Sequence, residues 1–148
     1  MTLSLQEISD RMEIQDLLYH YAELIDGKRF DELVNVFTPD SHIDYSAFGG
    51  SVGNLEETIA FLKKAMPMFP HTQHSNANVQ IKVSGDSGTG RVMCFNPQEM
   101  DLPSGGKQVM MFGLWYIDEY ARTDAGWRIR RRSEEKSWTF NTPDFMKL

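Results

Sequence analysis

The chain has 148 residues, of which 41% are hydrophobic and 24% are charged, and its formal net charge at pH 7 is −6. This size fits a single domain spanning residues 1–148, and the composition is typical of a folded globular protein rather than a disordered chain. The excess of acidic residues argues against general nucleic-acid binding, which depends on a basic surface.

The cysteine content and the N-terminal segment indicate the compartment. Cys94 is the single cysteine, which excludes an internal disulfide and fits a reducing environment. The first ten residues lack the basic segment and apolar run of a signal peptide, and no apolar stretch approaches the roughly 18–20 residues that cross a bilayer. We therefore expect a cytoplasmic protein with no membrane partner.

Helical periodicity dominates the start of the chain. Ser4 and Glu7 have the spacing of a capping box, so a first helix is expected to begin near Leu5 and to end before Gly27. Its apolar stripe consists of Ile14, Leu17, Leu18, Tyr21, Leu24 and Ile25.

Two further helices and one strand are expected before residue 72. A shorter helix follows Gly27 and ends at residues 38–40, and residues 42–48 alternate like a strand. A second capping box precedes a third helix at residues 55–66, which Pro67 stops.

From residue 72 onward, the helical period gives way to the two-residue period of strands. Four strands separated by turn sequences are expected, at residues 73–83, 89–100, 108–122 and 127–140. Helices followed by a run of hairpin-linked strands are typical of an α+β domain.

The third of these strands is apolar on both faces between residues 109 and 117. Three helices can cover only one side of an antiparallel sheet, so the other side must be buried by something else, most simply a second copy of the chain. We therefore expect a homo-oligomer, and the sequence does not distinguish a trimer from a dimer.

The segment before the first long strand contains two histidines. In a strand that starts near His74, one face carries four polar residues: His74, Asn76, Asn78 and Gln80. This face is either solvated or lines, at its start, a partly polar cavity covered by the helices. His71 and His74 point to opposite faces of an extended segment and have no second ligand pair nearby, so no metal site is expected.

Asp26 stands at the end of the first helix, where the helix dipole disfavours negative charge by roughly 0.3–1 kcal/mol. A histidine ring N–H would offset this cost, and the carboxylate would in turn stabilise the imidazolium. Paired with His74, Asp26 would form a general base that works near neutral pH. Spacing alone is also consistent with an ordinary Asp-Gly turn at Asp26.

Three segments, at residues 13–40, 71–81 and 113–132, resemble the SnoaL-like branch of the nuclear transport factor 2-like superfamily. Their order extends the resemblance over roughly residues 8–140. It implies a cone-shaped α+β half-barrel, with three N-terminal helices packed on a curved, mainly antiparallel sheet. Within this branch the chain is most similar to bile acid 7α-dehydratase, scytalone dehydratase and hexachlorocyclohexane dehydrochlorinase. These enzymes are lyases that use an Asp–His pair and no cofactor.

The resemblance implies roles for particular residues. Asp26 and His74 match the catalytic pair, and Tyr21 and Tyr45 match pocket tyrosines of the dehydratases. Lys136 falls where the bile acid enzyme has an arginine near its substrate. Tyr21 and Asp26 lie roughly 140° apart around an ideal helix, so they share a pocket only if the ligand lies between them or the last turn is distorted.

Trp138, in the segment SWTFN, either folds over the pocket mouth as a substrate-binding residue or packs at a subunit contact. Together, the residues and the resemblance predict a cofactor-independent lyase of the dehydratase type, acting on an apolar cyclic, steroid-like or polyketide-like small molecule. An isomerase or a polyketide cyclase would use the same pair, because both begin by removing a proton next to a carbonyl. A non-catalytic ligand-binding or structural subunit is the alternative from a different class.

Overall fold

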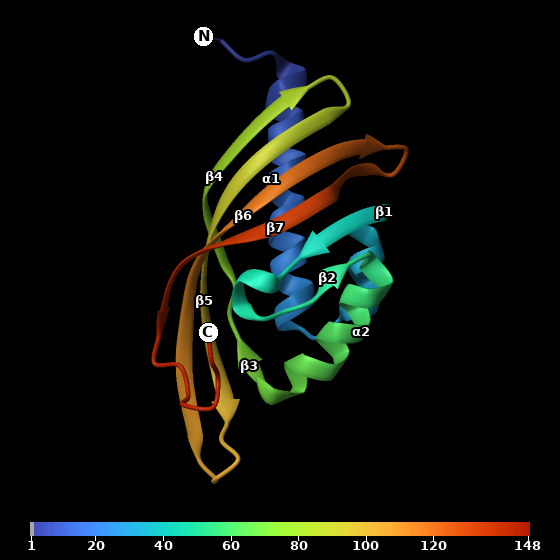
Figure 1. Ribbon diagram of the computed structural model, residues 1–148. Coiled ribbons are helices and arrows are strands. Elements are labelled where there is room, and N and C mark those ends of the chain that lie inside the picture. Colours follow the sequence, from blue (N-terminus) through green and yellow to red (C-terminus); the bar gives the residue numbers. More distant parts are fainter. Residues whose placement is uncertain (1) are drawn as a thin grey trace.

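Seven strands form one curved sheet in the computed structural model, which describes residues 2–148 (Figure 1). The strands are β1 (Phe37–Asp44), β2 (Val52–Gly53), β3 (His71–Thr72), β4 (Ser75–Ser84), β5 (Ser87–Asp101), β6 (Lys107–Thr123) and β7 (Gly126–Phe140). They run in the order β2-β1-β7-β6-β5-β3, with β4 also pairing with β5. Because β1 pairs in parallel with β7 and the other pairs are antiparallel, the sheet is mainly antiparallel, as predicted.

The helix α1 (Leu5–Asp26) packs along the long strands and begins with the predicted capping box. The Ser4 hydroxyl accepts a hydrogen bond from the Glu7 backbone N–H at 3.1 Å, and the Glu7 carboxylate accepts one from the Ser4 N–H at 3.1 Å. Gly27 caps the other end. No helix within residues 2–148 is long and apolar enough to cross a membrane.

The helix α2 (Leu55–Ala65) also begins as predicted. Asn54 and Glu57 exchange two hydrogen bonds of 2.9 Å between side chain and backbone. Pro67 ends the α-helix within a short 3₁₀ turn, η3 (Met66–Met68). With η1 (Phe30–Asn35), these helices cover one side of the open sheet, which confirms the predicted α+β half-barrel (Figure 1).

The segment between α1 and α2 departs from the prediction in two ways. The short second helix, η1 (Phe30–Asn35), is a 3₁₀ helix, and β1 begins at Phe37 rather than within residues 42–48. The pairing of β1 with β7 shifts between Phe37 and His42, so Pro39 lies in an irregular stretch of the ladder. Proline is tolerated in a strand where no ladder hydrogen bond is required of it, so residues 38–40 lie within β1 instead of ending the second helix, which already ends at Asn35.

A bulge in β4 divides the polar face that the sequence predicted for this strand. The pairing with β5 shifts just before Gln80, and Asn78 has a positive φ of 45°. Before the bulge, the Asn76 amide donates a hydrogen bond to the Leu18 carbonyl oxygen at 3.0 Å, so this part faces α1. After the bulge, Gln80 is exposed and Ile81 is buried. The prediction of one continuous polar face is wrong beyond Asn76, because the bulge reverses the facing of the residues that follow.

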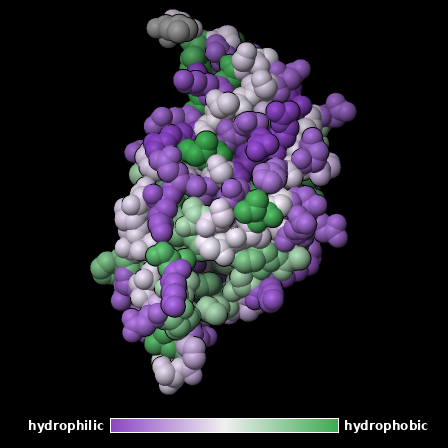
Figure 2. All heavy atoms as spheres, in the orientation of Figure 1, coloured by the Kyte–Doolittle hydropathy of each residue, from purple (hydrophilic) through white to green (hydrophobic). Residues whose placement is uncertain are grey.

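Both faces of β6 are apolar, as predicted. Met110, Phe112, Leu114 and Tyr116 are buried under the helices. On the opposite, outer face, Val109 and Ile117 are 42% and 38% exposed. In the view of Figure 2, hydrophilic side chains cover much of the upper half of the molecule, and hydrophobic ones gather in the lower half.

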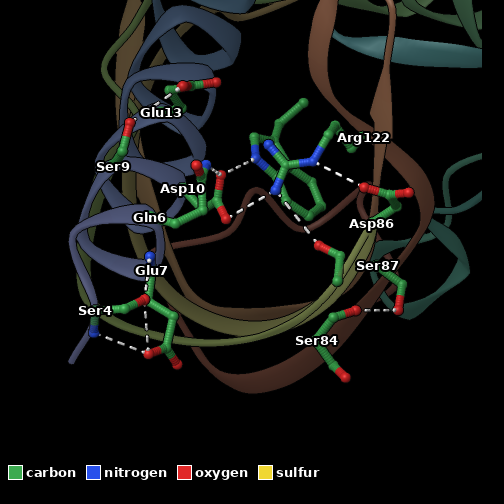
Figure 3. A network of polar contacts seen from close by, with 12 residues as sticks. Ser4, Gln6, Glu7, Ser9, Asp10, Glu13, Ser84, Asp86, Ser87 and Arg122 are labelled. Carbon is green, nitrogen blue, oxygen red and sulfur yellow. Dashed lines mark hydrogen bonds and ion pairs between the residues drawn. The ribbon is translucent and has the colours of Figure 1, made fainter. Parts of the chain in front are cut away.

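A buried polar network attaches the start of α1 to the sheet (Figure 3). The Asp10 carboxylate accepts hydrogen bonds from Arg122 on β6 at 2.8 Å, from the Trp127 indole on β7 at 3.1 Å, and from Gln6 at 3.0 Å. Arg122 also binds Asp86, in the turn before β5, at 3.0 Å. This network fixes α1 against the sheet, and so helps to place Tyr21 and Asp26 further along the helix.

Candidate active site

Asp26, the last residue of α1, contacts His74, which lies between β3 and β4. The His74 Nδ1 atom is 2.6 Å from one carboxylate oxygen of Asp26, and the His74 backbone N–H donates to the other oxygen at 2.9 Å. The Thr72 hydroxyl donates a third hydrogen bond to the carboxylate at 2.8 Å. The His74 and Asp26 side chains are only 7% and 25% exposed. The structure thus brings together the two residues that the resemblance paired.

These contacts determine the ionisation of Asp26. Burial raises the pKa of this carboxyl, but the hydrogen bonds and the charge of His74, together with the Thr72 hydroxyl, outweigh burial and hold the pKa below its usual value. Asp26 is therefore a carboxylate at neutral pH and accepts hydrogen bonds. It follows that Nδ1 of His74 carries a proton and that Nε2 holds the free lone pair of the neutral ring.

Asn96, on β5, contacts the other side of the His74 ring. Its amide nitrogen lies 3.0 Å from Nε2 of His74, so the amide donates to the free lone pair. The Asn96 side-chain oxygen is buried and has no hydrogen-bond partner. Turning this amide over would let the oxygen accept a hydrogen bond from the Nε2–H of an imidazolium, so Asn96 suits both charge states of His74.

Tyr21 and Tyr45 form a buried pair of hydroxyl groups. The two phenol oxygens lie 2.6 Å apart, and the side chains come from α1 and from the residue that follows β1. Burial raises the pKa of both tyrosines, more strongly for Tyr45, so both stay neutral at pH 7. One hydroxyl donates to the other, which leaves one proton available for a ligand.

The guanidinium of Arg132 packs against the ring of Tyr21. It lies 4.4 Å from the Tyr21 ring centre and 3.9 Å from that of Tyr116. It also makes two hydrogen bonds, of 2.8 and 2.7 Å, to the Asp118 carboxylate, and both partners are fully buried. The charge of Arg132 is therefore neutralised by Asp118.

These groups line one cavity of about 120 Å³. Its polar walls are Tyr21, Tyr45, His74, Asn96, Gln98 and Glu134, and its apolar walls include Ile25, Phe48, Phe61, Leu62 and Met66. The cavity lies between the tyrosines and His74, so Tyr21 and His74 face it from different directions. A cavity of about 150 Å³ holds a benzene molecule, so this one is on the scale of a single ring and somewhat smaller.

Three polar lining residues were not predicted from the sequence: Asn96, Gln98 and Glu134. On β5, Asn96 and Gln98 follow the buried Cys94 at every second position and so share its face, and this two-residue period is the signal that could have revealed them. Glu134 follows Arg132 by two residues on β7 and shares its inner face. Burial raises the pKa of Glu134 to about 8, against the opposing charge of Arg132.

The two residues predicted to bind substrate lie outside this cavity. Lys136 is exposed, but its Nζ is 5.9 Å from the ring centre of Phe48, a wall of the cavity. Trp138 pairs with Gly113 and is 44% exposed, and its ring lies 5.8 Å from that of Phe95. The pairing of β6 with β7 shifts between these two residues of β7, and this bulge turns Trp138 to the outer face of the sheet. Trp138 therefore does not line the cavity.

No group of three or more His, Cys, Asp or Glu side chains within residues 2–148 is arranged to hold a metal ion. The polar atoms that line the cavity are phenols, amides, one imidazole and one carboxyl, which suit proton transfer and hydrogen bonding.

Comparison with known proteins identifies relatives of this chain. An uncharacterised protein of Mycobacterium tuberculosis (strain H37Rv) is 47% identical over 134 residues, which are 90% of each chain. A solved structure from Novosphingobium aromaticivorans that carries the provisional name scytalone dehydratase has a TM-score of 0.81 at 19% identity, covering 93% of this chain and 90% of that one. A hexachlorocyclohexane dehydrochlorinase (LinA, type 2) has a TM-score of 0.81 at 18% identity, covering 97% and 96%. The SnoaL-like domain matches residues 6–133, and the chain therefore belongs to the SnoaL-like domain family.

Proposed function

We propose that this protein is a cofactor-independent lyase of the dehydratase type, acting on a small apolar cyclic molecule that carries a carbonyl group. The observation that carries the proposal is the 2.6 Å contact between Asp26 and His74, because His74 lines the same cavity as the tyrosine pair. The names of the two structural relatives, a dehydratase and a dehydrochlorinase, both describe eliminations and support this class of reaction.

His74 is the proposed general base. Substrate entering the cavity displaces the Asn96 amide from Nε2, and Nε2 then takes a proton from the carbon next to the carbonyl. Asp26 remains ionised and stabilises the imidazolium that forms at Nδ1. General bases held in this way contribute typically 10²–10⁴-fold to the rate.

The tyrosine pair is the proposed oxyanion site. As the C–H bond breaks, its electron pair moves onto the carbonyl oxygen, and the free hydroxyl proton of Tyr21 or Tyr45 donates a hydrogen bond to that oxygen. Collapse of the enolate then expels the hydroxyl group on the next carbon, with a proton, as water. An isomerase would instead return the proton to a different carbon, and a cyclase would form a new carbon–carbon bond from the same enolate.

The first experiment tests proton removal itself. A panel of ring-sized cyclic ketones is incubated with the protein in D₂O, and exchange of the proton next to the carbonyl is followed by ¹H NMR. We expect the wild type to catalyse exchange and His74→Gln and Asp26→Asn to lower its rate by about 10²–10⁴-fold. His71→Gln is the matched control, because the His71 side chain is 76% exposed and does not line the cavity.

Full exchange activity in both His74→Gln and Asp26→Asn would contradict the mechanism. A wild type that catalyses no exchange on any ketone would instead favour a binding or structural subunit. Mass spectrometry of β-hydroxy ketone products separates the reaction types, because loss of water lowers the mass by one water and isomerisation leaves it unchanged.

We also propose that the chain forms a homo-oligomer through the outer face of the sheet. Exposed apolar side chains gather there, including Phe95, Val109, Ile117 and Trp138. The cytoplasmic location expected from the single cysteine stays a prediction, and Cys94 is buried within the core.

A further inference from the structure

Glu134 is a buried carboxyl group without a partner. It lines the cavity beside the tyrosine pair, and its Oε2 atom is inaccessible to solvent and makes no hydrogen bond. Buried carboxylates in folded proteins are normally paired with a cation or with hydrogen-bond donors. Glu134 is not explained by the packing of the fold, and nothing in the base or oxyanion steps above uses it.

The charges around Glu134 favour its neutral form. The nearest inner-face cation, Arg132, donates its two hydrogen bonds from Nε and Nη2 to Asp118, and its Nη1 makes no hydrogen bond, so Glu134 receives none from it in this arrangement. Tyr116, opposite Glu134 on β6, and the tyrosine pair are neutral phenols. Asp44 on β1 adds a further negative charge. With an enolate forming in the same cavity, a second anion at Glu134 would be repelled, so the site is compatible with the reaction only when this carboxyl keeps its proton.

We propose that Glu134 is the general acid that protonates the departing hydroxyl group of the substrate. The proposal rests on the function proposed above and names its substrate class more closely: cyclic ketones whose hydroxyl group lies on the carbon two positions from the carbonyl. Burial raises the pKa of Glu134 to about 8, so the group is mostly protonated at pH 7.

The enolate electrons form the new C=C bond while the C–O bond breaks, and the pair from the C–O bond stays on the oxygen. The Glu134 proton moves to that oxygen, and water leaves. Glu134 is then a carboxylate and His74 an imidazolium, and the proton on His74 returns to Glu134 through the released water before the next turnover. No oxidant or reductant is needed.

The leaving group distinguishes this acid from His74 or a tyrosine. Hydroxide needs a proton to depart at neutral pH, whereas acetate does not, because acetic acid is a strong enough acid for its anion to leave unaided. We therefore compare water loss from a β-hydroxy cyclic ketone with acetate loss from the matching β-acetoxy ketone. In Glu134→Gln we expect the first rate to fall by about 100-fold or more and the ratio of the two rates to change by the same order.

Glu135→Gln is the matched control. Glu135 neighbours Glu134 but is exposed on the outer face, where it binds Arg91 at 2.7 Å. This variant should keep both rates. Circular dichroism and thermal unfolding of Glu134→Gln establish that the variant is folded before rates are compared.

A second readout follows the carboxyl group without catalysis. Carbon-13 NMR of side-chain carboxyls, assigned with Glu134→Gln, should show one glutamate still protonated at pH 7 that titrates near 8. The charged and titratable groups around it are Arg132 and Lys136 on its own strand, Tyr116 on β6, Cys94 on β5, Asp44 and Tyr45 at the end of β1, Tyr21 on α1, and His74 across the cavity.

The outcomes separate this inference from the function on which it rests. Exchange next to the carbonyl in the wild type, with an unchanged ratio of hydroxyl to acetate loss in Glu134→Gln, would overturn the role of Glu134 alone. A Glu134 signal that is ionised at pH 7 would overturn it as well. No exchange in the wild type would overturn the proposed function itself, and the general acid with it.

Discussion

The Tyr45 hydroxyl is the polar group whose removal should change the least structure and the most activity. Tyr45→Phe keeps the buried ring and removes one partner of the 2.6 Å contact with Tyr21. Loss of one oxyanion donor typically costs about 10²–10³-fold in kcat. We expect a fall of that order in kcat, measured with the β-hydroxy ketone, and a much smaller change in KM. Tyr19→Phe, on the exposed side of α1, is the control, and equal kcat values for Tyr45→Phe and the wild type would exclude Tyr45 as the oxyanion donor.

Glu134 should also make the stability of the fold depend on pH. Its pKa is about 8 in the folded chain and about 4.5 in the unfolded one, so between these values unfolding releases a proton. Its contribution to stability is complete below pH 4.5 and is lost as the pH rises through 8, at about 1.4 kcal/mol per pH unit. Glutamine does not titrate, so urea unfolding at pH 5, 7 and 9 should show Glu134→Gln gaining on the wild type as the pH rises. Parallel stability curves would show that Glu134 is not buried as the structure has it.

Asp10 joins α1 to β6 and β7, so its substitution tests how the first helix is held. Chiefly because of the hydrogen bond from Arg122, the pKa of Asp10 is lowered to about 2, and its contribution to stability is present above pH 3.8 and lost as the pH falls through 2. Asp10→Asn leaves the Arg122 charge without its buried partner, which should lower the free energy of unfolding by about 1–3 kcal/mol at pH 7. Urea unfolding measures this, with the exposed Asp16→Asn on the same helix as control; equal losses in both variants would contradict the role of the network.

The helices and the strands differ in how far the sequence determines them. The starts of α1 and α2 follow from capping boxes, which are local interactions three residues apart, and both are where the sequence predicted them. The bulges at Asn78 and before Trp138 are set by pairing with a neighbouring strand, and neither residue carries a local signal of it. The family resemblance was the basis for pairing Asp26 with His74. Asn96 and Glu134 face the cavity because of strand registers, which the amino-acid sequence does not specify.

The two sides of the sheet differ in what covers them. Helices fill the inner side and leave the cavity between α1, α2 and the strands, while the outer side has no such cover within residues 2–148. Trp138 belongs to that outer side, next to Phe95, which suits the subunit contact that the sequence left open for it. The same bulge thus removes Trp138 from the cavity and adds it to the exposed apolar face.

If copies of the chain bury this face against one another, the protein should sediment at a multiple of 17.0 kDa. Val109, 42% exposed on the outer face of β6, is the position to change. Burying a valine contributes about 1.5–3 kcal/mol, and a buried unpaired carboxylate costs more, so Val109→Glu should weaken association by at least about 100-fold. Val34→Glu is the control, because Val34 is 57% exposed on η1, away from the sheet. Analytical ultracentrifugation across a concentration series measures both variants, and a wild type that stays at 17.0 kDa would show that the outer face has a different partner or none.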